Sequence, residues 1–323
     1  MSSAGGFVPK KLLIVGATGL VGSRITDAIV KNRDSFERLA IFTSPSTAQS
    51  KAEVIERLKK EGVEIIEGDV TKTEDIQHAF QDVDTVISAV GRNAIESQIE
   101  MIRIADESPS VRRFFPSEYG TDIEHGPGSA VEKPHQKKLQ VRAAIRGCKN
   151  LEHTYVVTGP YADGEFGLYF GASPFKEAGN FDVKNKEATL IEDGQLKISF
   201  TTMKDVGKLV VLALKHPDAS KNRALRVNSF TTCDKEILAE FEKQTGGQAW
   251  KVTYTSLDKV KQLEQEAWNN GVPYATVFTL RRIWAEGGTL YEARDNHLIE
   301  ADEGMETLAD AVAEAIRVQT AAS

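Results

Sequence analysis

Three glycines near the start of the chain stand three residues apart, within the string Gly16-Ala17-Thr18-Gly19-Leu20-Val21-Gly22. The string follows an apolar run at residues 12–15, which is typical of a buried strand, and precedes a helical pattern at 23–31. Strand, glycine turn and helix in this order form the phosphate-binding corner of a dinucleotide fold. Glycines allow the tight turn and the close approach of backbone to pyrophosphate, and the free N–H groups at the helix start face the phosphates. We therefore predict a cofactor site at residues 16–22; the alternative is a purely structural turn.

The end of the second predicted strand decides between NAD and NADP. An acidic residue at this position hydrogen-bonds the ribose of NAD and repels a 2′-phosphate. Here the strand at residues 39–42 leads into Thr43 and Ser44, with no acid. Their hydroxyls and the ammonium of Lys51 suit a phosphate dianion, so we predict NADPH or NADP+. The alternative is a plain Ser/Thr/Pro loop with a solvated lysine.

A cationic helical segment at residues 133–146 could supply acid catalysis. It contains Lys133, His135, Lys137 and Lys138 close together. A lysine that is partly desolvated beside a cofactor can have its pKa lowered towards the working range, and can then act as an acid or a stabilising charge. His135 could relay a proton. Spacing does not choose between Lys137 and Lys138, and solvated surface lysines with a polar helix histidine are the alternative.

Small and polar residues follow three further apolar runs, at the expected carboxyl ends of strands. Ligands of open parallel sheets bind at this edge, so these residues are candidates for cofactor contacts. The candidates are Asp69, Ala89, Val90, Gly91, Pro116, Ser117 and Glu118. Asp69 could meet the adenine or could cap the next segment. Tyr119 could touch the substrate or belong to the strand-end structure.

These candidate residues can lie close together only in a fold that brings the ends of several strands to one edge of a sheet. Apolar strand patterns alternate with helical patterns six times before residue 160. The predicted strands are 12–15, 39–42, 63–67, 84–91, 111–115 and 155–157. The predicted helices are 23–31, 52–60, 73–80 and 133–146. A further helix carries Ile95, Ile99 and Ile102, and Asn93 caps it. Residues 121–133 are predicted to form a surface loop. Because parallel crossovers are right-handed and carry helices, this alternation predicts an α/β fold with a Rossmann-type doubly wound parallel sheet.

The pattern changes after residue 160. Seven aromatic residues gather between 155 and 181, and they are Tyr155, Tyr161, Phe166, Tyr169, Phe170, Phe175 and Phe181. They could form the walls of a pocket for a flat or apolar molecule, or the hydrophobic seam between two domains. Further on we expect a hairpin at 187–200 that turns at Asp193-Gly194, strands at 224–227 and 250–254, and helices at 202–214, 234–244, 257–268, 274–284 and 307–317.

We therefore expect an NADP(H)-binding domain at residues 1–160, with a tail at 1–9, and a smaller mixed α/β substrate-binding region at 161–323. This second region could return strands or helices to the first domain.

The composition narrows the classes of function. The chain has 323 residues, 41% of them hydrophobic and 27% charged, which is typical of a soluble globular protein. A net charge of −7 argues against nucleic acid or an anionic membrane as partner. There is no run of about 18 apolar residues, so no membrane helix is expected. Cys148 and Cys233 have no Cys or His partner nearby in the sequence. We therefore expect free thiols, a cytoplasmic location and no metal site. The oligomeric state is expected to be monomer or homodimer.

Three motifs resemble one known family. Residues 16–22, the string Phe114-Phe115-Pro116-Ser117-Glu118-Tyr119-Gly120 and the string Lys138-Leu139-Gln140-Val141-Arg142 are similar to the isoflavone reductase-like enzymes, within the NmrA-like branch of atypical short-chain dehydrogenases/reductases. The similarity covers the first half well and the second half mainly by layout. It implies NADPH-dependent reduction of aromatic or phenylpropanoid-type secondary metabolites. It also implies that Lys138 is the catalytic lysine and contacts the cofactor.

The sequence departs from the family at three points. The arginine that commonly holds the 2′-phosphate is replaced by the stretch at residues 42–44. His135 stands where an aromatic residue is usual, and residues 158–161 differ from the plant enzymes, so the substrate pocket does not carry over. The Tyr-x-x-x-Lys dyad of ordinary short-chain dehydrogenases is also absent, since Tyr155 is followed at that spacing by Gly159, so spacing does not support a tyrosine-driven mechanism.

Two rival functions fit the same motifs. An NmrA-like redox sensor would bind NADP without turnover and contact a protein partner, and a non-redox enzyme would keep NADPH as a structural ligand. Lys138 favours the reductase over the sensor, because a sensor needs no acid there. The sequence names neither the substrate nor the bond that is reduced.

Overall fold

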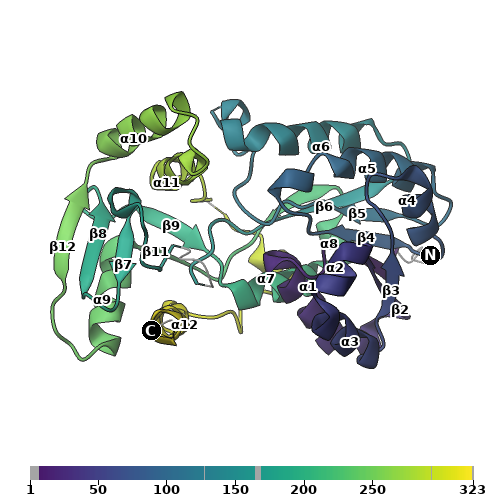
Figure 1. The fold of residues 1–323 in the computed structure, drawn as a ribbon, viewed down its shortest axis with the longest axis horizontal. Helices are drawn as coiled ribbons and strands as arrows, with labels where there is room; N and C mark the ends of the chain where they lie inside the picture. Colours follow the sequence, from purple (N-terminus) through teal and green to yellow (C-terminus); the bar gives the residue numbers. More distant parts are fainter. Residues whose placement is uncertain (1–6, 127, 164–168, 292, 322–323) are drawn as a thin grey trace, which may run out of the picture.

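A seven-stranded parallel sheet forms the centre of the N-terminal lobe, on the right of Figure 1. The computed structural model describes residues 7–126, 128–163, 169–291 and 293–321. The strands, in chain order, are β1 (Lys11–Val15), β2 (Arg38–Thr43), β3 (Glu64–Glu67), β4 (Thr85–Ser88), β5 (Arg113–Phe115), β6 (Glu152–Val157) and β10 (Arg223–Arg226). Their order across the sheet is β10-β6-β5-β4-β1-β2-β3, so β2 and β3 are added on one side of β1 and the later strands on the other, and the strand order reverses between β1 and β4. This confirms the predicted doubly wound sheet and places a ligand edge at the ends of β1 and β4.

Helices cover both faces of this sheet, because the side chains of each strand alternate. In β1, Leu12 and Ile14 face one side, and Leu13 and Val15 face the other. The helices on the first face are α1 (Leu20–Lys31), α3 (Ala52–Lys60) and α7 (Met203–Lys215). Those on the second face are α4 (Thr73–Ala79), α5 (Ser97–Glu107) and α6 (Gln136–Gly147).

Helix α7 brings the second half of the chain back to the N-terminal sheet. Thr202 caps it by accepting a hydrogen bond from the backbone N–H of Asp205. Gly207 lies where α7 crosses α1, and a Cβ at this position would be 2.2 Å from the carbonyl oxygen of Arg24. The missing side chain therefore permits the close approach of the two helices.

A buried carboxylate at the start of α7 gives a testable pH dependence. Asp163 accepts a hydrogen bond of 2.7 Å from the backbone N–H of Met203, and burial raises its pKa to about 6. The unfolded chain loses this proton near pH 4, so the stability of the fold declines between about pH 4 and pH 6 and stays lower above. The helix dipole favours the anion by only ~0.3–1 kcal/mol, which is less than the cost of its desolvation, so the pKa stays raised.

We expect Asp163→Asn to raise the free energy of unfolding by about 1–3 kcal/mol at pH 7.5, and by much less at pH 4. Urea unfolding at the two pH values measures both. The exposed Asp34→Asn is the control, and an equal gain at both pH values would contradict the assignment.

The C-terminal lobe, on the left of Figure 1, contains two small sheets. Its strands are β7 (Asn180–Asp182), β8 (Glu187–Ile191), β9 (Lys197–Phe200), β11 (Phe230–Cys233) and β12 (Lys251–Thr255). The sheets have the orders β12-β8-β7 and β11-β9. The main helices around them are α9 (Asp234–Gln244), α10 (Leu257–Asn269), α11 (Ala275–Ala285) and α12 (Leu308–Ala321). An aromatic core that includes Phe170, Phe181, Phe200 and Phe241 packs between the β7–β8–β12 sheet, α9 and α12.

The predicted hairpin at 187–200 is wrong, although both of its strands exist. β8 pairs with β7 on one side and with β12 on the other, so β9 has no free edge of β8 to join. β9 pairs instead with β11. Asp234 stabilises the end of β8, where the chain leaves this sheet, because its carboxylate accepts a hydrogen bond of 3.0 Å from the backbone N–H of Ile191.

Smaller differences concern helix ends and loops. A short helix, α2 (Pro45–Ser50), follows β2 in place of the predicted loop, with Ser44 as its cap. Asn93 lies inside the 3-10 turn Arg92–Ala94 and does not cap α5. Ile99 is 37% exposed, because the buried face of α5 is formed by Gln98, Met101, Ile102 and Ala105 and leaves this position at its edge. The segment 121–123 of the expected surface loop is buried beneath the C-terminal lobe.

No helix in the described residues is both long and apolar enough to cross a membrane.

Candidate active site

The glycine turn follows β1 at the point where the sheet order reverses. Gly16 has φ +79°, and a Cβ on it would lie 2.6 Å from the carbonyl oxygen of Ala89 at the end of β4. A Cβ on Gly22 would lie 2.0 Å from the carbonyl oxygen of Gly16. Side chains at either position would push the turn, β4 and α1 apart. The two glycines therefore keep the backbone close enough to cradle a phosphate group.

Helix α1 begins directly at this turn. Its cap residue, Gly19, provides no side-chain hydrogen bond to the first turn. The N–H groups of Leu20, Val21 and Gly22 stand in that turn, where an α-helix has no internal acceptors for them. Leu20 is 40% exposed, so the helix start is open on this side. These donors fit the pyrophosphate of a dinucleotide.

Lys51 reaches the glycine turn from the other side. Its Nζ donates a hydrogen bond of 2.6 Å to the carbonyl oxygen of Thr18. Ser44 lies at the start of α2, with its hydroxyl 2.9 Å from that of Thr47. Thr43 ends β2, and its carbonyl accepts the N–H of Gly68. The structure thus brings a lysine and several hydroxyls to the end of β2, where the ribose of the cofactor would lie.

We expect Lys51→Gln to weaken NADPH binding about tenfold and NADH binding less than twofold, because a hydrogen bond to a charged group contributes ~1.5–3 kcal/mol. Titration of cofactor fluorescence measures both affinities. Lys59→Gln, in an exposed ion pair on α3, is the control. An equal loss for the two cofactors would remove Lys51 from the recognition of the 2′-phosphate.

Asp69 stabilises the turn that directly follows β3. Its carboxylate accepts hydrogen bonds of 2.8 Å from both the N–H and the hydroxyl of Thr71. Of the two roles left open for Asp69, the capping of the next segment is the one that these contacts support.

The ends of β4 and β5 are tied together below the cofactor edge. The hydroxyl of Ser117 donates to the carbonyl oxygen of Val90 at 2.9 Å, and the N–H of Ser117 donates to the side chain of Gln98 at 2.8 Å. Pro116 accepts the N–H of Glu118. Beyond β4, Gly91 is exposed and a Cβ on it would meet no atom within 4 Å. This edge therefore combines a fixed wall with an open space beside it.

Lys138 points from α6 to the end of β5. Its Nζ donates a hydrogen bond of 2.5 Å to the carbonyl oxygen of Glu118, which leaves two further N–H donors. Burial lowers the pKa of Lys138, and the charges of Arg92 and Arg142 act in the same direction, whereas Glu118 opposes them. Lys137 instead pairs with Glu96 at 2.6 Å on the exposed surface. The geometry thus separates two lysines that spacing could not.

His135 lies one turn before Lys138 and is buried. Its Nδ1 lies 2.8 Å from the carbonyl oxygen of Ser129, which can only accept, so Nδ1 carries the proton. Burial lowers the pKa of His135, and the charge of Lys138 adds to this. The ring is therefore neutral near pH 7. Its Nε2 is a buried acceptor that has no partner among the described residues.

Tyr119 follows Glu118 directly, but its ring packs in the core beneath the sheet edge. Its hydroxyl is buried with no hydrogen-bond partner in the described part of the chain. Burial raises the pKa of Tyr119, so the phenol keeps its proton. Its carbonyl oxygen accepts a hydrogen bond from the hydroxyl of Tyr161. Tyr119 thus links the end of β5 to the C-terminal half, and a role in substrate contact stays a prediction.

A buried ion-pair network lies beneath Lys138. Arg142, 2% exposed, donates to both carboxylate oxygens of Glu118 at 2.9 and 3.1 Å. It also donates to Asp122 at 3.1 Å and to Glu124 at 2.9 Å. Burial alone would raise the pKa of Asp122, but Arg142 and Arg226 hold it below its ordinary value. The network fixes the backbone of Glu118, whose carbonyl oxygen holds Lys138.

Three polar residues of this site, Arg142, Arg92 and Gln98, have no role that sequence pattern could predict. Arg142 is visible in the sequence only as part of a family motif, and its acidic partners lie 18 to 24 residues away. Helix α11 also reaches this region, because Trp284 donates its indole N–H to the hydroxyl of Thr121 at 2.9 Å.

Six of the seven aromatic residues at 155–181 are described, and all six pack in or against hydrophobic cores. Phe170 and Phe181 are fully buried in the core of the C-terminal lobe. Tyr155 stacks on the guanidinium of Arg142, with 4.4 Å between Cζ and the ring centre. Phe166 lies outside the described residues. Core packing therefore accounts for Phe170 and Phe181, which are not pocket walls.

Within the described residues, no group of three His, Cys, Asp or Glu side chains is placed to hold a metal ion. Cys148 and Cys233 are free thiols.

Comparison with known proteins identifies a family model and relatives that agree with one another. The model of the NmrA-like family matches residues 9–295. An isoflavone reductase of Glycine max is 28% identical over 309 residues, which cover 91% of this chain and 93% of the relative. Eugenol synthase 2 of Clarkia breweri is 30% identical over 261 residues, which cover 80% of this chain and 81% of the relative.

Solved structures share the whole fold. A crystal structure of isoflavone reductase has a TM-score of 0.78 at 25% identity and covers 94% of this chain and 99% of its own. The complex of leucoanthocyanidin reductase with NADPH from Vitis vinifera has a TM-score of 0.76 at 21% identity and covers 95% and 99%.

Proposed function

The chain belongs to the NmrA-like family, and from this membership we propose that it is an NADPH-dependent reductase of an aromatic or unsaturated small molecule. The observation that carries the proposal is the position of Lys138. A partly buried ammonium, with its pKa lowered by desolvation, stands at the same sheet edge as the glycine turn. A protein that only binds the nucleotide gains nothing from a desolvated lysine there.

The residues at the sheet edge fit the cofactor. The backbone at residues 16–22 would hold the pyrophosphate, and Lys51 with Ser44 would hold the 2′-phosphate. When bound, NADPH supplies a hydride to the substrate. The relative solved with NADPH supports this choice of cofactor.

Lys138 would stabilise or protonate the negative charge that develops on the substrate. Its hydrogen bond to Glu118 fixes the direction of the ammonium, and its lowered pKa makes it a better proton donor near neutral pH. His135 presents an unprotonated Nε2 nearby, which can accept a hydrogen bond from a substrate hydroxyl. General acid catalysis of this kind contributes ~10²–10⁴ in rate.

The substrate class rests on the relatives. Isoflavone reductase and eugenol synthase are named for aromatic compounds, and we extend this class to the chain as phenylpropanoid-type secondary metabolites.

A screen for NADPH consumption tests the proposal. Purified protein is mixed with NADPH and a panel of isoflavones, aromatic enones and ketones, and benzylic ethers, and loss of NADPH absorbance is followed. We expect consumption with at least one compound and little with NADH. Tight NADPH binding with no consumption by any compound would favour an NADP-binding regulator instead.

A further inference from the structure

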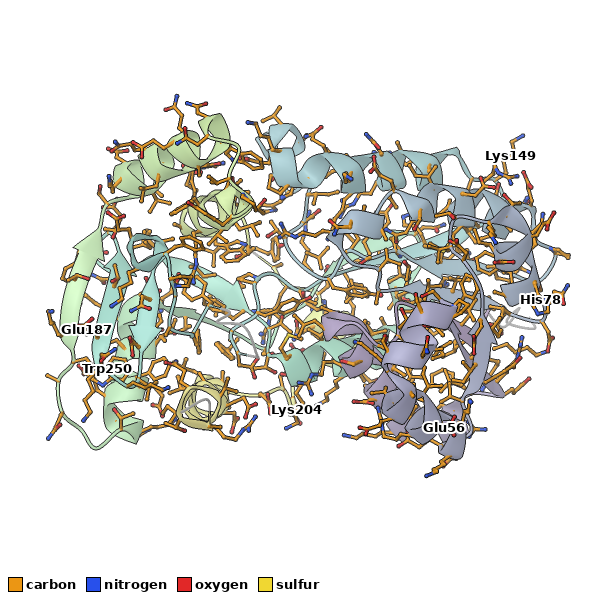
Figure 2. The ribbon with its side chains drawn as sticks, viewed as in Figure 1. Glu56, His78, Lys149, Glu187, Lys204 and Trp250 are labelled. Carbon is orange, nitrogen blue, oxygen red and sulfur yellow. The ribbon has the colours of Figure 1, made fainter. Side chains whose placement is uncertain are left out.

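A hollow of about 460 Å³ lies in the C-terminal lobe, on the β7–β8–β12 sheet. It is bounded by the 3-10 turn Lys176–Ala178 and by the start of α10. Glu187, labelled at the left of Figure 2, marks its place at the end of the molecule opposite to His78. The volume is in the range of small-molecule sites. None of its lining residues takes part in the site around Lys138.

The floor of this hollow is polar, because the sheet turns its apolar side away. Phe181 and Leu190 point into the aromatic core on the other face. Strand alternation then places Asn180 and Thr189 on the side of the hollow, where Thr253 from β12 joins them. The hydroxyls of Thr189 and Thr253 lie 2.9 Å apart.

Asn180, on the floor of the hollow, has an unsatisfied side-chain donor. It is 1% exposed, and its Oδ1 accepts the N–H of Ser173 at 2.7 Å. Its Nδ2 is buried and has no partner among the described residues. An unpaired buried donor costs ~1–3 kcal/mol, so an acceptor atom at this place would be strongly favoured. The missing partner of Nδ2 is therefore an acceptor, which an oxygen-rich group supplies.

The rim of the hollow is cationic. Lys176 and Lys251 each place Nζ 3.1 Å from the carboxylate of Glu187. Lys259, in the first turn of α10, has no ion pair within the described residues. Three lysines face two glutamates, Glu177 and Glu187, so the lining keeps a positive balance.

We propose that this hollow is a second ligand site, which binds a small organic polyanion of metabolite size. Its carboxylate or phosphate oxygens accept from Nδ2 of Asn180 and pair with Lys251 and Lys259. Charge-assisted hydrogen bonds of this kind are stronger than neutral ones. The proposal does not depend on the reductase activity, because it rests on other residues.

Calorimetric titration of the full chain with citrate, inorganic phosphate and glucose 6-phosphate tests the site and separates carboxylate from phosphate ligands. We expect saturable binding of at least one probe. Lys251→Gln/Lys259→Gln should weaken it at least tenfold, and Asn180→Asp should abolish it. Lys235→Gln/Lys243→Gln on α9 removes the same charge elsewhere, and should leave binding unchanged.

Three results would overturn the proposal. The first is the absence of saturable binding for all three probes at millimolar concentration. The second is equal binding by the two double-lysine variants. The third is loss of binding in Lys51→Gln, which would place the anion in the cofactor site. If Asn180→Asp does not fold, the surface lysine variants still decide.

Discussion

Lys138→Met is expected to lower turnover with NADPH by ~10²–10⁴-fold and to leave NADPH binding within about threefold. Methionine keeps the length of the side chain but removes the charge and the donors. The ammonium of Lys138 donates to the carbonyl oxygen of Glu118, a contact that no other described lysine makes. Steady-state rates and fluorescence titration of NADPH measure the two effects separately.

Lys137→Met is the matched control, because Lys137 is adjacent on the same helix but pairs with Glu96 at the surface. Its turnover should change less than twofold. If Lys137→Met lost activity and Lys138→Met kept it, the assignment of the acid would be reversed.

Arg142→Met is expected to lower the free energy of unfolding by ~3–5 kcal/mol, since it leaves buried carboxylates without their cation. Glu118 is 1% exposed and would keep no ion pair within the described residues, and Asp122, 2% exposed, would keep only Arg226. Arg142 holds the pKa of Asp122 below its ordinary value, which contributes stability above the unfolded pKa and is lost in acid. The deficit of the variant should therefore shrink as the pH falls below about 4.

Arg146→Met provides the comparison for this experiment. Arg146 also pairs with Glu124, but it is 54% exposed. Its loss should cost less than ~1 kcal/mol. Urea unfolding of both variants gives the difference, and equal costs would show that the buried network adds no stability beyond a surface pair.

Much of the fold can be predicted from local pattern. The strands and helices of the N-terminal lobe are visible because each has its own periodicity and a clear end, and the alternation forces a parallel sheet. The hairpin failed for the opposite reason. Whether β8 pairs with β9 or with β12 depends on residues about 60 positions away, and the two strands look alike in both cases.

The candidate site divides in the same way. The glycines at residues 16–22 join a strand and a helix that are adjacent in the sequence, so the turn could be predicted, whereas the approach of Gly16 to Ala89 could not. Lys137 and Lys138 could not be separated from spacing, because the rotation of α6 decides which one faces β5. The partners of Arg142 come from a loop whose path only the folded chain reveals.

The crossing at Gly207 makes the nucleotide-binding part of this protein inseparable from the second half of the chain. A fragment that stopped near residue 160 would lack α7 and β10, and would expose Ile25, Ile29 and the edge of β6. The glycine turn sits at the head of α1, whose flank rests on α7. A chimera that replaced the second half of the chain would therefore have to keep α7 and β10 so that α1 and the glycine turn stay supported.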